Sequence, residues 1–137
     1  MDFQSTEEFR QEIIALTAEW QTRLRLNDWN ITIAIMDGED PGFFADSQSN
    51  LAYQAAHLRF RHPRLHPAQE DTAACIDTEA TVVHELLHVR SNNLPEEAHT
   101  ALQKDLDRWE CFIELTAQAM VAAKRGETRL GYAPAAV

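Results

Sequence analysis

The first part of the chain carries hydrophobic side chains at the spacing of a helix. The series begins after Ser5-Thr6-Glu7-Glu8 and runs through Phe9, Ile13, Leu16, Trp20 and Leu24. A Ser followed three residues later by Glu forms a capping box, in which both side chains bind free amides at a helix start. Hydrophobic residues every three or four positions are typical of a helix with one face in the core. We therefore predict a first helix that runs to about Leu26.

The period then changes to two, which is typical of strands. After a turn at Asn27-Asp28, Ile31, Ile33 and Ile35 alternate with polar or small residues and predict a half-buried strand over Trp29–Met36. A loop precedes a short second strand, which we expect over Phe43–Asp46. A third strand is expected over Tyr53–Arg61, and its phase turns three residues toward the core: Ala56, Leu58 and Phe60.

Two further helices are predicted in the second half. Thr78-Glu79 supplies a start signal for the apolar run Ala80–Val89, whose stripe consists of Ile76, Ala80, Val83 and Leu87. After a break, Pro95 starts a second helix that should end near Gly126. Its apolar stripe consists of Leu102, Leu106, Trp109, Ile113, Ala117 and Met120. Residues 61–71 are expected to form a surface loop, and residues 128–137 a loose tail.

The apolar run contains the sequence His-Glu-Leu-Leu-His, from His84 to His88. On a helix, side chains four residues apart share one face at a separation of roughly 6 Å, so both imidazoles can reach one metal ion. Neutral imidazole is a good ligand for zinc. Glu85 projects about 100° away from His84, where it can reach a water bound to the ion more easily than the ion itself. The motif predicts a zinc-activated water with Glu85 as general base.

A catalytic zinc needs a third protein ligand and one position open for water. The metzincin arrangement is excluded, because Ser91 and Leu94 stand where a Gly and a His would be needed. Glu110 lies on the edge of the stripe of the last helix, where a metal ion is an obvious partner for a carboxylate. We predict Glu110 as the third ligand and Glu114 as the acceptor for the free ring N–H of one His. Glu114 stays an alternative ligand, whereas Cys111 lies roughly opposite the stripe, which disfavours it.

The two motifs together resemble the gluzincin pattern of zinc peptidases. The matching segments are His84-Glu85-Leu86-Leu87-His88 and Glu110-Cys111-Phe112-Ile113-Glu114. The resemblance implies that Glu110 binds zinc and that Glu114 supports a His, although thermolysin-like gluzincins have Asp at the second position. The short spacing is similar to that of minimal gluzincins and of HExxH proteins common in bacteriophages and prophages. By this resemblance, Tyr53–Arg61 is the candidate edge strand that holds a substrate backbone by strand addition.

Length and composition are consistent with one domain. The chain has 137 residues, 45% of them hydrophobic, which is enough for one modest core. We expect an α+β, zincin-like domain over residues 1–137, with an N-terminal helix, a three-stranded twisted sheet, the HExxH helix and the glutamate helix. No segment approaches the roughly 20 apolar residues of a membrane span and no signal peptide is visible, so we expect a soluble, cytoplasmic protein, in the host cytoplasm if phage-encoded. Cys75 and Cys111 are expected to be buried free thiols.

The net charge of −10 disfavours binding to nucleic acid. We expect the single basic cluster to be a solvated strand end and loop; it consists of Arg59, Arg61 and Arg64 with His57, His62 and His66. The rings of His62 and His66 are expected to be exposed or at the border of the cleft, because Pro63 and Pro67 disfavour a helix that would pair them on a metal. A further donor for the transition state is expected among Tyr53, His57, His99 and Tyr132, with no preference between them.

Three functions are consistent with these motifs. The first is a zinc-dependent metallopeptidase that hydrolyses peptide bonds of a peptide or protein substrate, with Glu85 as general base. The second is a zinc-binding interaction or regulatory module of a phage or prophage, without proteolysis of its own. The third is a zinc hydrolase of a non-peptide amide, such as a cell-wall fragment. We expect the first, acting as an endopeptidase.

Overall fold

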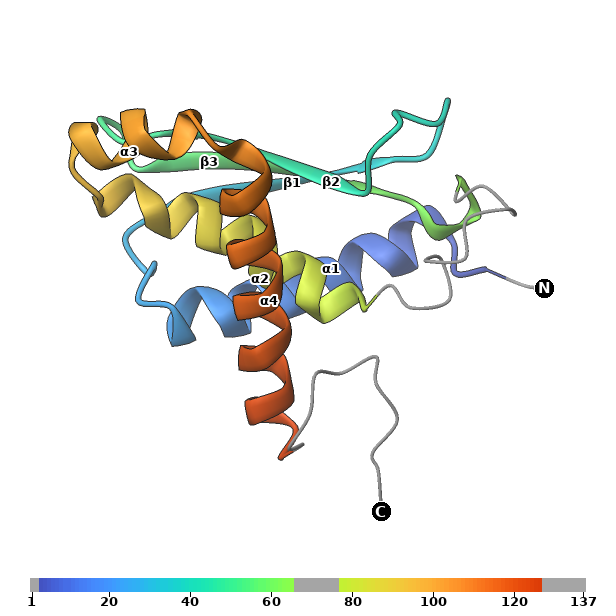
Figure 1. Ribbon diagram of the computed structural model, residues 1–137. Coiled ribbons are helices and arrows are strands. Elements are labelled where there is room, and N and C mark those ends of the chain that lie inside the picture. Colours follow the sequence, from blue (N-terminus) through green and yellow to red (C-terminus); the bar gives the residue numbers. More distant parts are fainter. Residues whose placement is uncertain (1–2, 66–76, 127–137) are drawn as a thin grey trace, which may run out of the picture.

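The fold combines helices with one small mixed sheet. The computed structural model describes residues 3–65 and 77–126. The described helices and strands are α1 (Thr6–Arg23), β1 (Asn30–Met36), β2 (Ala45–Asn50), β3 (Ala55–Arg61), η1 (Pro63–Leu65), α2 (Thr78–Arg90), η3 (Ser91–Asn93), α3 (Glu96–Gln103) and α4 (Leu106–Lys124). The α+β class and the three strands predicted from the pattern are confirmed (Figure 1).

The sheet has the order β1-β3-β2, so β3 is its central strand. β1 runs parallel to β3, whereas β2 runs antiparallel to it and pairs from Ala45 with Phe60 to Asn50 with Ala55. The expectation that Tyr53–Arg61 is an edge strand is therefore wrong, and β2 is the edge that packs against α2. The predicted second strand over Phe43–Asp46 was also placed too early. Its sequence lacks the β-branched and aromatic residues that mark strands, and only pairing with β3 makes it one.

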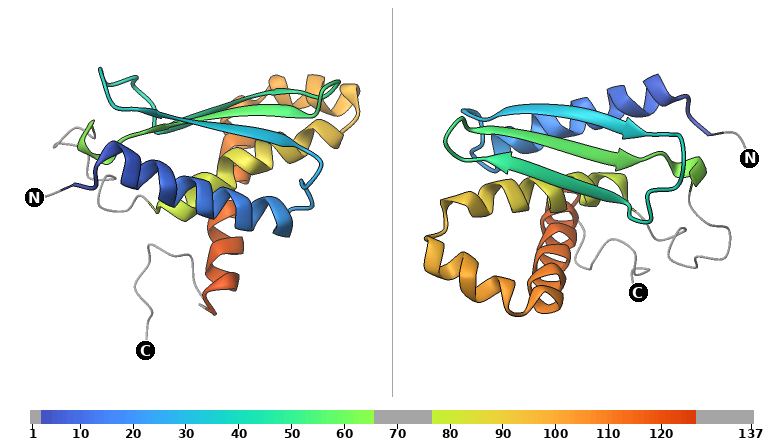
Figure 2. Two further views of the ribbon diagram at one scale, coloured as in Figure 1. Left: turned by 180° about the vertical axis from the view of Figure 1, so that it is seen from behind. Right: turned by 90° about the horizontal axis from the view of Figure 1, so that it is seen from above.

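The core lies between the sheet and two helices. Figure 2 shows the sheet as one layer, with α1 and α2 packed on the same face of it. The predicted inward phase of β3 is confirmed, because Ala56, Leu58 and Phe60 are all buried. α1 contributes Phe9, Ile13 and Trp20 and α2 contributes Ala80, Val82, Val83, Leu86 and Val89. No helix in residues 3–65 and 77–126 is long and apolar enough to cross a membrane.

The start of α1 agrees with the predicted capping box. The Ser5 hydroxyl accepts a hydrogen bond from the Glu8 amide at 3.1 Å, and the Glu8 carboxylate accepts one from the Ser5 amide at 3.3 Å. The helix ends at Arg23, three residues before the predicted end, because Leu24 forms its C-cap and Arg25 takes a left-handed backbone conformation with φ 60°. The buried side chains of Leu24 and Leu26 then close the core below β1.

The helix expected from Pro95 to Gly126 is in fact two helices. α3 ends at Gln103, and Asp105 starts α4 by accepting a hydrogen bond from the Arg108 amide at 3.3 Å. An Asp side chain that binds nearby amides competes with continuation of a helix and favours a new start. The apolar stripe is therefore divided: Ile113 and Ala117 are buried against α2, whereas Leu106 remains 48% exposed.

Two expectations about individual side chains were wrong. His62 is buried: its Nε2 donates to the Gln4 carbonyl at 2.8 Å, and its Nδ1 accepts from the Arg64 amide at 3.2 Å. Cys111 is free but exposed, because it lies on the side of α4 that faces away from α2. The other members of these predictions, His66 and Cys75, lie outside the described residues.

The C-terminal end of α4 is fixed to the start of α2 by a cluster of charges. Glu79 is only 7% exposed and accepts hydrogen bonds from Trp20, at 2.6 Å, and from Lys124 and Arg125 of α4. Burial alone would raise the pKa of Glu79, but the hydrogen bonds from Lys124 and Trp20 bring it below its usual value. The buried carboxylate is therefore ionised and paired, and it connects α1, α2 and α4.

We predict that Asp77 stabilises the fold in two separable ways. Its side chain caps α2 through the Ala80 amide at 3.0 Å and pairs with Arg125. Asp77→Ala removes both contacts and should lower the free energy of unfolding by about 1–2 kcal/mol. Asp77→Asn keeps a good cap and should cost less than about 1 kcal/mol. Urea unfolding followed by circular dichroism measures both variants, and equal losses would contradict the role of the cap.

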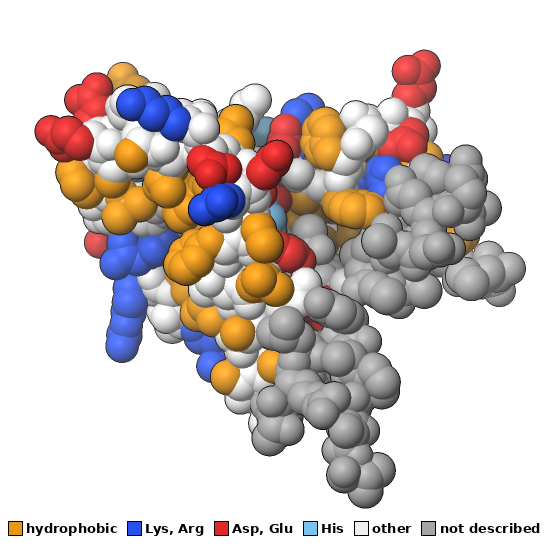
Figure 3. All heavy atoms as spheres, viewed as in Figure 1, with side chains coloured by type: hydrophobic (Ala, Val, Ile, Leu, Met, Phe, Trp, Pro, Cys, Tyr) orange, Lys and Arg blue, Asp and Glu red, His pale blue; other side chains and the backbone are white. Residues whose placement is uncertain are grey.

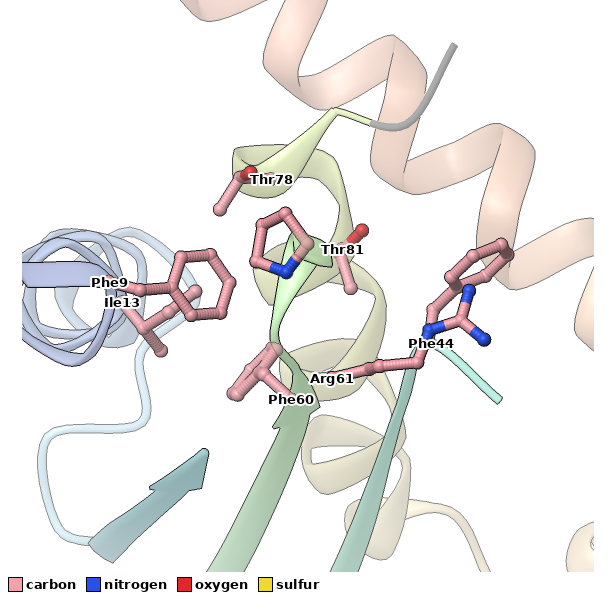
Figure 4. A pocket seen from close by; sticks show the side chains of 8 residues that line it. Phe9, Ile13, Phe44, Phe60, Arg61, Thr78 and Thr81 are labelled. Atoms are coloured by element: carbon pink, nitrogen blue, oxygen red, sulfur yellow. The ribbon is translucent and has the colours of Figure 1, made fainter. Parts of the chain in front are cut away.

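A small pocket opens between α1, the end of β3 and the start of α2 (Figure 4). Phe9, Ile13 and Phe60 line it, and Thr78 and Thr81 face it from α2. None of the residues predicted to bind zinc or to act on substrate lines this pocket. The residues of the His-Glu-Leu-Leu-His motif lie further along α2.

Candidate metal centre

α2 presents its two histidines on one side, as the four-residue spacing predicts. The rings of His84 and His88 have their centroids 5.1 Å apart, and both side chains are partly buried, with 16% and 21% exposure. The neighbouring residues Val83, Leu86 and Val89 are fully buried, so the opposite side of the helix is anchored in the core. This packing fixes which way the two imidazoles point.

α4 brings Glu110 to both histidines. One carboxylate oxygen lies 3.0 Å from Nε2 of His84, and the other lies 3.1 Å from Nε2 of His88. His84, His88 and Glu110 each offer a ligand atom, and these atoms all lie within 4.8 Å of one another. In a tetrahedral zinc site with bonds of about 2.0–2.1 Å, neighbouring ligand atoms are roughly 3.4 Å apart. The donor set has the chemistry of a zinc site, and the distances of Glu110 to the two histidines are close to this spacing.

Glu114 takes the position predicted for it, one turn beyond Glu110. Its carboxylate oxygen lies 2.8 Å from Nδ1 of His84. Both nitrogens of His84 thus face carboxylate oxygens, yet a neutral imidazole has only one N–H to donate. A second proton or a metal cation must therefore lie between His84 and one of its two carboxylates. A cation at Nε2 would leave Nδ1–H to donate to Glu114.

The electrostatics differ between the two histidines. Burial disfavours the charged form of His84, but its hydrogen bond with Glu114 and the charges of Glu85 and Glu110 raise its pKa above the usual value. Burial lowers the pKa of His88, and Glu110 offsets this only in part. The hydrogen bond with His84 in turn lowers the pKa of Glu114. The centre therefore attracts positive charge, which a proton or a metal ion can supply.

Glu85 does not join this cluster but lies beside it. The side chain is 5% exposed, and burial raises its pKa to about 7, against the effects of the His84 charge and a hydrogen bond with Ser47 of β2. A carboxylate with a pKa near neutrality can accept a proton and release it again at working pH. Glu85 therefore has the properties of a general base, and it lies where α2 packs under the edge strand.

Glu110 lies beside both histidines, but one part of the reasoning for it was wrong. We expected its carboxylate to be set in an apolar face, but the side chain is 50% exposed. The first turns of α4 extend beyond α2, so Glu110 reaches the histidines from the rim of the site rather than from the core. Figure 3 shows histidine and carboxylate side chains coming to the surface together beside α4.

The other candidate donors lie elsewhere. His99 binds the Ser91 carbonyl at 2.8 Å, His57 lies 2.7 Å from the Thr32 hydroxyl, and Tyr53 is 82% exposed. Tyr132 lies outside the described residues. The basic cluster is largely neutralised, since Arg59 pairs with Asp46 and Arg61 pairs with Asp40. None of these contacts brings a further donor to His84, His88 and Glu110.

Two neighbours of the site were missed by the sequence analysis. Trp109 meets the ring of His88 edge-on at 6.3 Å and stacks on the exposed ring of Phe112. Ser47 of β2 lies near enough to Glu85 to act against the rise in the pKa of its carboxyl. Trp109 was assigned to the core because it shares the period of the stripe, and a Ser in a polar segment carries no signal in sequence. We find no match to this chain among protein-family models, curated proteins or solved structures.

Proposed function

We propose that this protein is a zinc-dependent peptidase. The observation that carries the proposal is the convergence of His84, His88 and Glu110 from two helices, with ligand atoms within 4.8 Å of one another. Three protein ligands that leave a fourth position open are characteristic of catalytic zinc sites. The buried carboxylate of Glu85 next to this triad supports hydrolysis rather than a purely structural metal.

Different residues of the site would bind the metal and transfer the proton. His84, His88 and Glu110 would hold the ion, and Glu114 would accept a hydrogen bond from Nδ1–H of His84 and so leave Nε2 as the ligand atom. A bound zinc ion supplies Lewis acidity, which lowers the pKa of a water molecule and polarises a carbonyl group. Glu85 accepts the proton of the attacking water and can pass it on to the leaving amine.

A peptide substrate would be held by the edge of β2 that pairs with no other strand in residues 3–65 and 77–126. This strand lies against α2 next to Glu85, and its other edge pairs with β3. An extended peptide can add to such an edge through main-chain hydrogen bonds. The last three residues of β2 are exposed and uncharged, so they do not repel a charged strand that is added here: Gln48, Ser49 and Asn50. β2 thus takes the role that we expected for Tyr53–Arg61.

Removal of zinc should abolish peptide hydrolysis. We expect the purified chain to cleave members of a peptide library, to lose this activity with a zinc chelator, and to regain it with one equivalent of zinc. Because a zinc-dependent step cannot proceed without the ion, activity that persists after complete removal of the metal would contradict the proposal. A zinc-loaded chain that cleaves no peptide would instead favour a non-proteolytic zinc module.

A further inference from the structure

The exposed side of α4 carries large hydrophobic side chains close to the metal centre. Phe112 is 61% exposed, and Leu106 and Leu115 are exposed as well. Figure 3 shows hydrophobic side chains gathered along this helix, next to the histidine and carboxylate groups. Single exposed hydrophobic residues are normal on a protein surface, whereas a group of them beside polar residues marks a binding surface. This side of α4 therefore offers an apolar surface next to the candidate metal ligands.

Two aromatic rings form a continuous path from the metal centre to this surface. Trp109 meets the ring of His88 edge-on, with the ring centroids 6.3 Å apart. Phe112 stacks on Trp109, with centroids 5.9 Å apart and 12° between the ring planes. Trp109 is partly buried and Phe112 is exposed, so the pair leads from a candidate zinc ligand out to solvent. One molecule could therefore reach both the metal ion and the ring of Phe112.

The surroundings of Phe112 favour an uncharged aromatic group. Its neighbours on the surface of α4 are Trp109 and Leu115, three residues away, and Arg108, four residues before it. None of these neighbours carries the negative charge that would attract Lys or Arg. Arg108 would repel them, although its pairing with Asp105 at 3.2 Å weakens this effect. Aromatic rings attract one another beyond the burial of apolar area when they stack with an offset or meet edge-on.

We propose that Trp109 and Phe112 form a subsite that binds an aromatic side chain of the peptide substrate. The inference rests on the proposed function, because it names the class of side chain selected at the same site. Trp109 and Phe112 would determine specificity and take no part in the chemical step. A peptide held on the edge of β2 would then be selected by the rings of α4 on the other side of the metal ligands.

The first test measures binding and needs no hydrolysis. N-acetylphenylalanine amide is titrated into the ¹⁵N-labelled chain while NMR follows the indole N–H signals of its three tryptophans, which Trp109→Phe assigns. We expect a saturable shift of the Trp109 signal alone, because Trp20 and Trp29 are buried in the core. N-acetylalanine amide should shift none of the three. No shift of Trp109, or equal shifts of all three signals, would overturn the proposal.

The same titration with variants identifies the ring that binds the probe. Phe112→Ala should weaken binding of N-acetylphenylalanine amide by at least about threefold, since one stacking partner is lost. Ile14→Ala is the matched control, because Ile14 is an exposed apolar residue of α1 and should not affect the titration. Equal affinities of the wild type and Phe112→Ala would overturn the role of Phe112.

The second test measures selection among substrates. Peptides that the wild type cleaves are prepared with Phe, Ala or Lys at each position beside the cleaved bond. At one position, kcat/KM should be at least about fivefold higher with Phe than with Ala, and with Lys no higher than with Ala. Phe112→Ala should reduce this preference to about twofold or less, mainly through KM, because the contact is made in the ground state and in the transition state alike. Ile14→Ala should keep the preference.

A preference for Phe that persists in Phe112→Ala would overturn the proposal. If the zinc-loaded wild type cleaves no peptide, the proposed function fails, and the NMR titration still decides whether the rings bind an aromatic group. The competing occupant of the rings is a second copy of the chain. Sedimentation should show a monomer at the concentrations of the titration, and a dimer that dissociates in Phe112→Ala would instead make the rings an interface between copies.

Discussion

Replacement of Glu85 by Gln should abolish hydrolysis and leave the metal centre intact. The amide of Gln has nearly the shape of the carboxylate but cannot accept a proton from water at neutral pH. General-base catalysis contributes about 10²- to 10⁴-fold, so we expect kcat to fall by about 10³-fold. Glu85 is not among the three residues whose ligand atoms cluster, so zinc content should stay near one per chain.

The measurement is peptide hydrolysis in parallel with elemental analysis of zinc. Glu79→Gln provides a matched control, since Glu79 lies six residues earlier on α2 and is buried to a similar degree, with 7% exposure against 5% for Glu85. It binds Trp20, Lys124 and Arg125 instead of facing the site, so Glu79→Gln should reduce stability without a specific loss of kcat. Full activity in Glu85→Gln would remove Glu85 from the mechanism.

Loss of either the second histidine or the carboxylate from α4 should release the metal. His88→Ala and Glu110→Ala each remove one of three protein ligands. Loss of an outer partner alone weakens metal affinity about 10- to 100-fold, so loss of a ligand should weaken it by at least about 10²-fold. Glu114 binds Nδ1 of His84 from outside the triad. Glu114→Ala should therefore fall within the smaller range.

Competition with a chromogenic chelator measures these affinities directly. Asp107→Ala is the control, because this exposed carboxylate lies in the first turn of α4, three residues before Glu110, but outside the ligand cluster. It should bind zinc as the wild type does. If Glu114→Ala lost the metal while Glu110→Ala kept it, the two glutamates would have exchanged roles. If the wild-type protein bound no zinc, this result would contradict the proposal of a zinc-dependent peptidase.

The HExxH helix and the shared face of its two histidines could be predicted from local sequence. His84 and His88 share a face because the helical repeat places every fourth residue there. Glu85 departs from that face by the same geometry, and the structure places it beside the cluster rather than in it. These relations depend only on residues within one turn. They were available before any tertiary contact was known.

The contact between α2 and α4 could not be predicted from the hydrophobic pattern alone. Glu110 was predicted as a ligand because a carboxylate beside an apolar stripe needs a partner, yet its side chain is half exposed. Ile113 and Ala117 dock α4 on α2, and this contact carries Glu110 to the histidines. The break at Asp105, which gives α4 its own direction, was not predicted. The side chain of Asp105 caps the start of α4, and this local contact divides the segment into two helices although the apolar spacing continues across it.

The order of the strands in the sheet could not be predicted from the sequence. The alternation in Tyr53–Arg61 identified the inward residues of β3, because side-chain direction is a property of a single strand. Strand order depends on which strands pair with one another, so nothing in the alternation of a single strand distinguishes a central strand from an edge. The polar sequence of β2 gave no strand signal of its own. For the same reason, the sequence did not indicate Ser47 as a neighbour of Glu85.

The helical spacing, the shared face of His84 and His88, the different direction of Glu85 and the inward residues of β3 follow from the sequence alone. Each of these follows from backbone geometry over a few neighbouring residues. The place of β2 at the edge beside α2 and the position of Glu110 between both imidazoles required the tertiary structure. Glu110 meets histidines 26 and 22 positions away in the chain, and this contact depends on how whole elements pack.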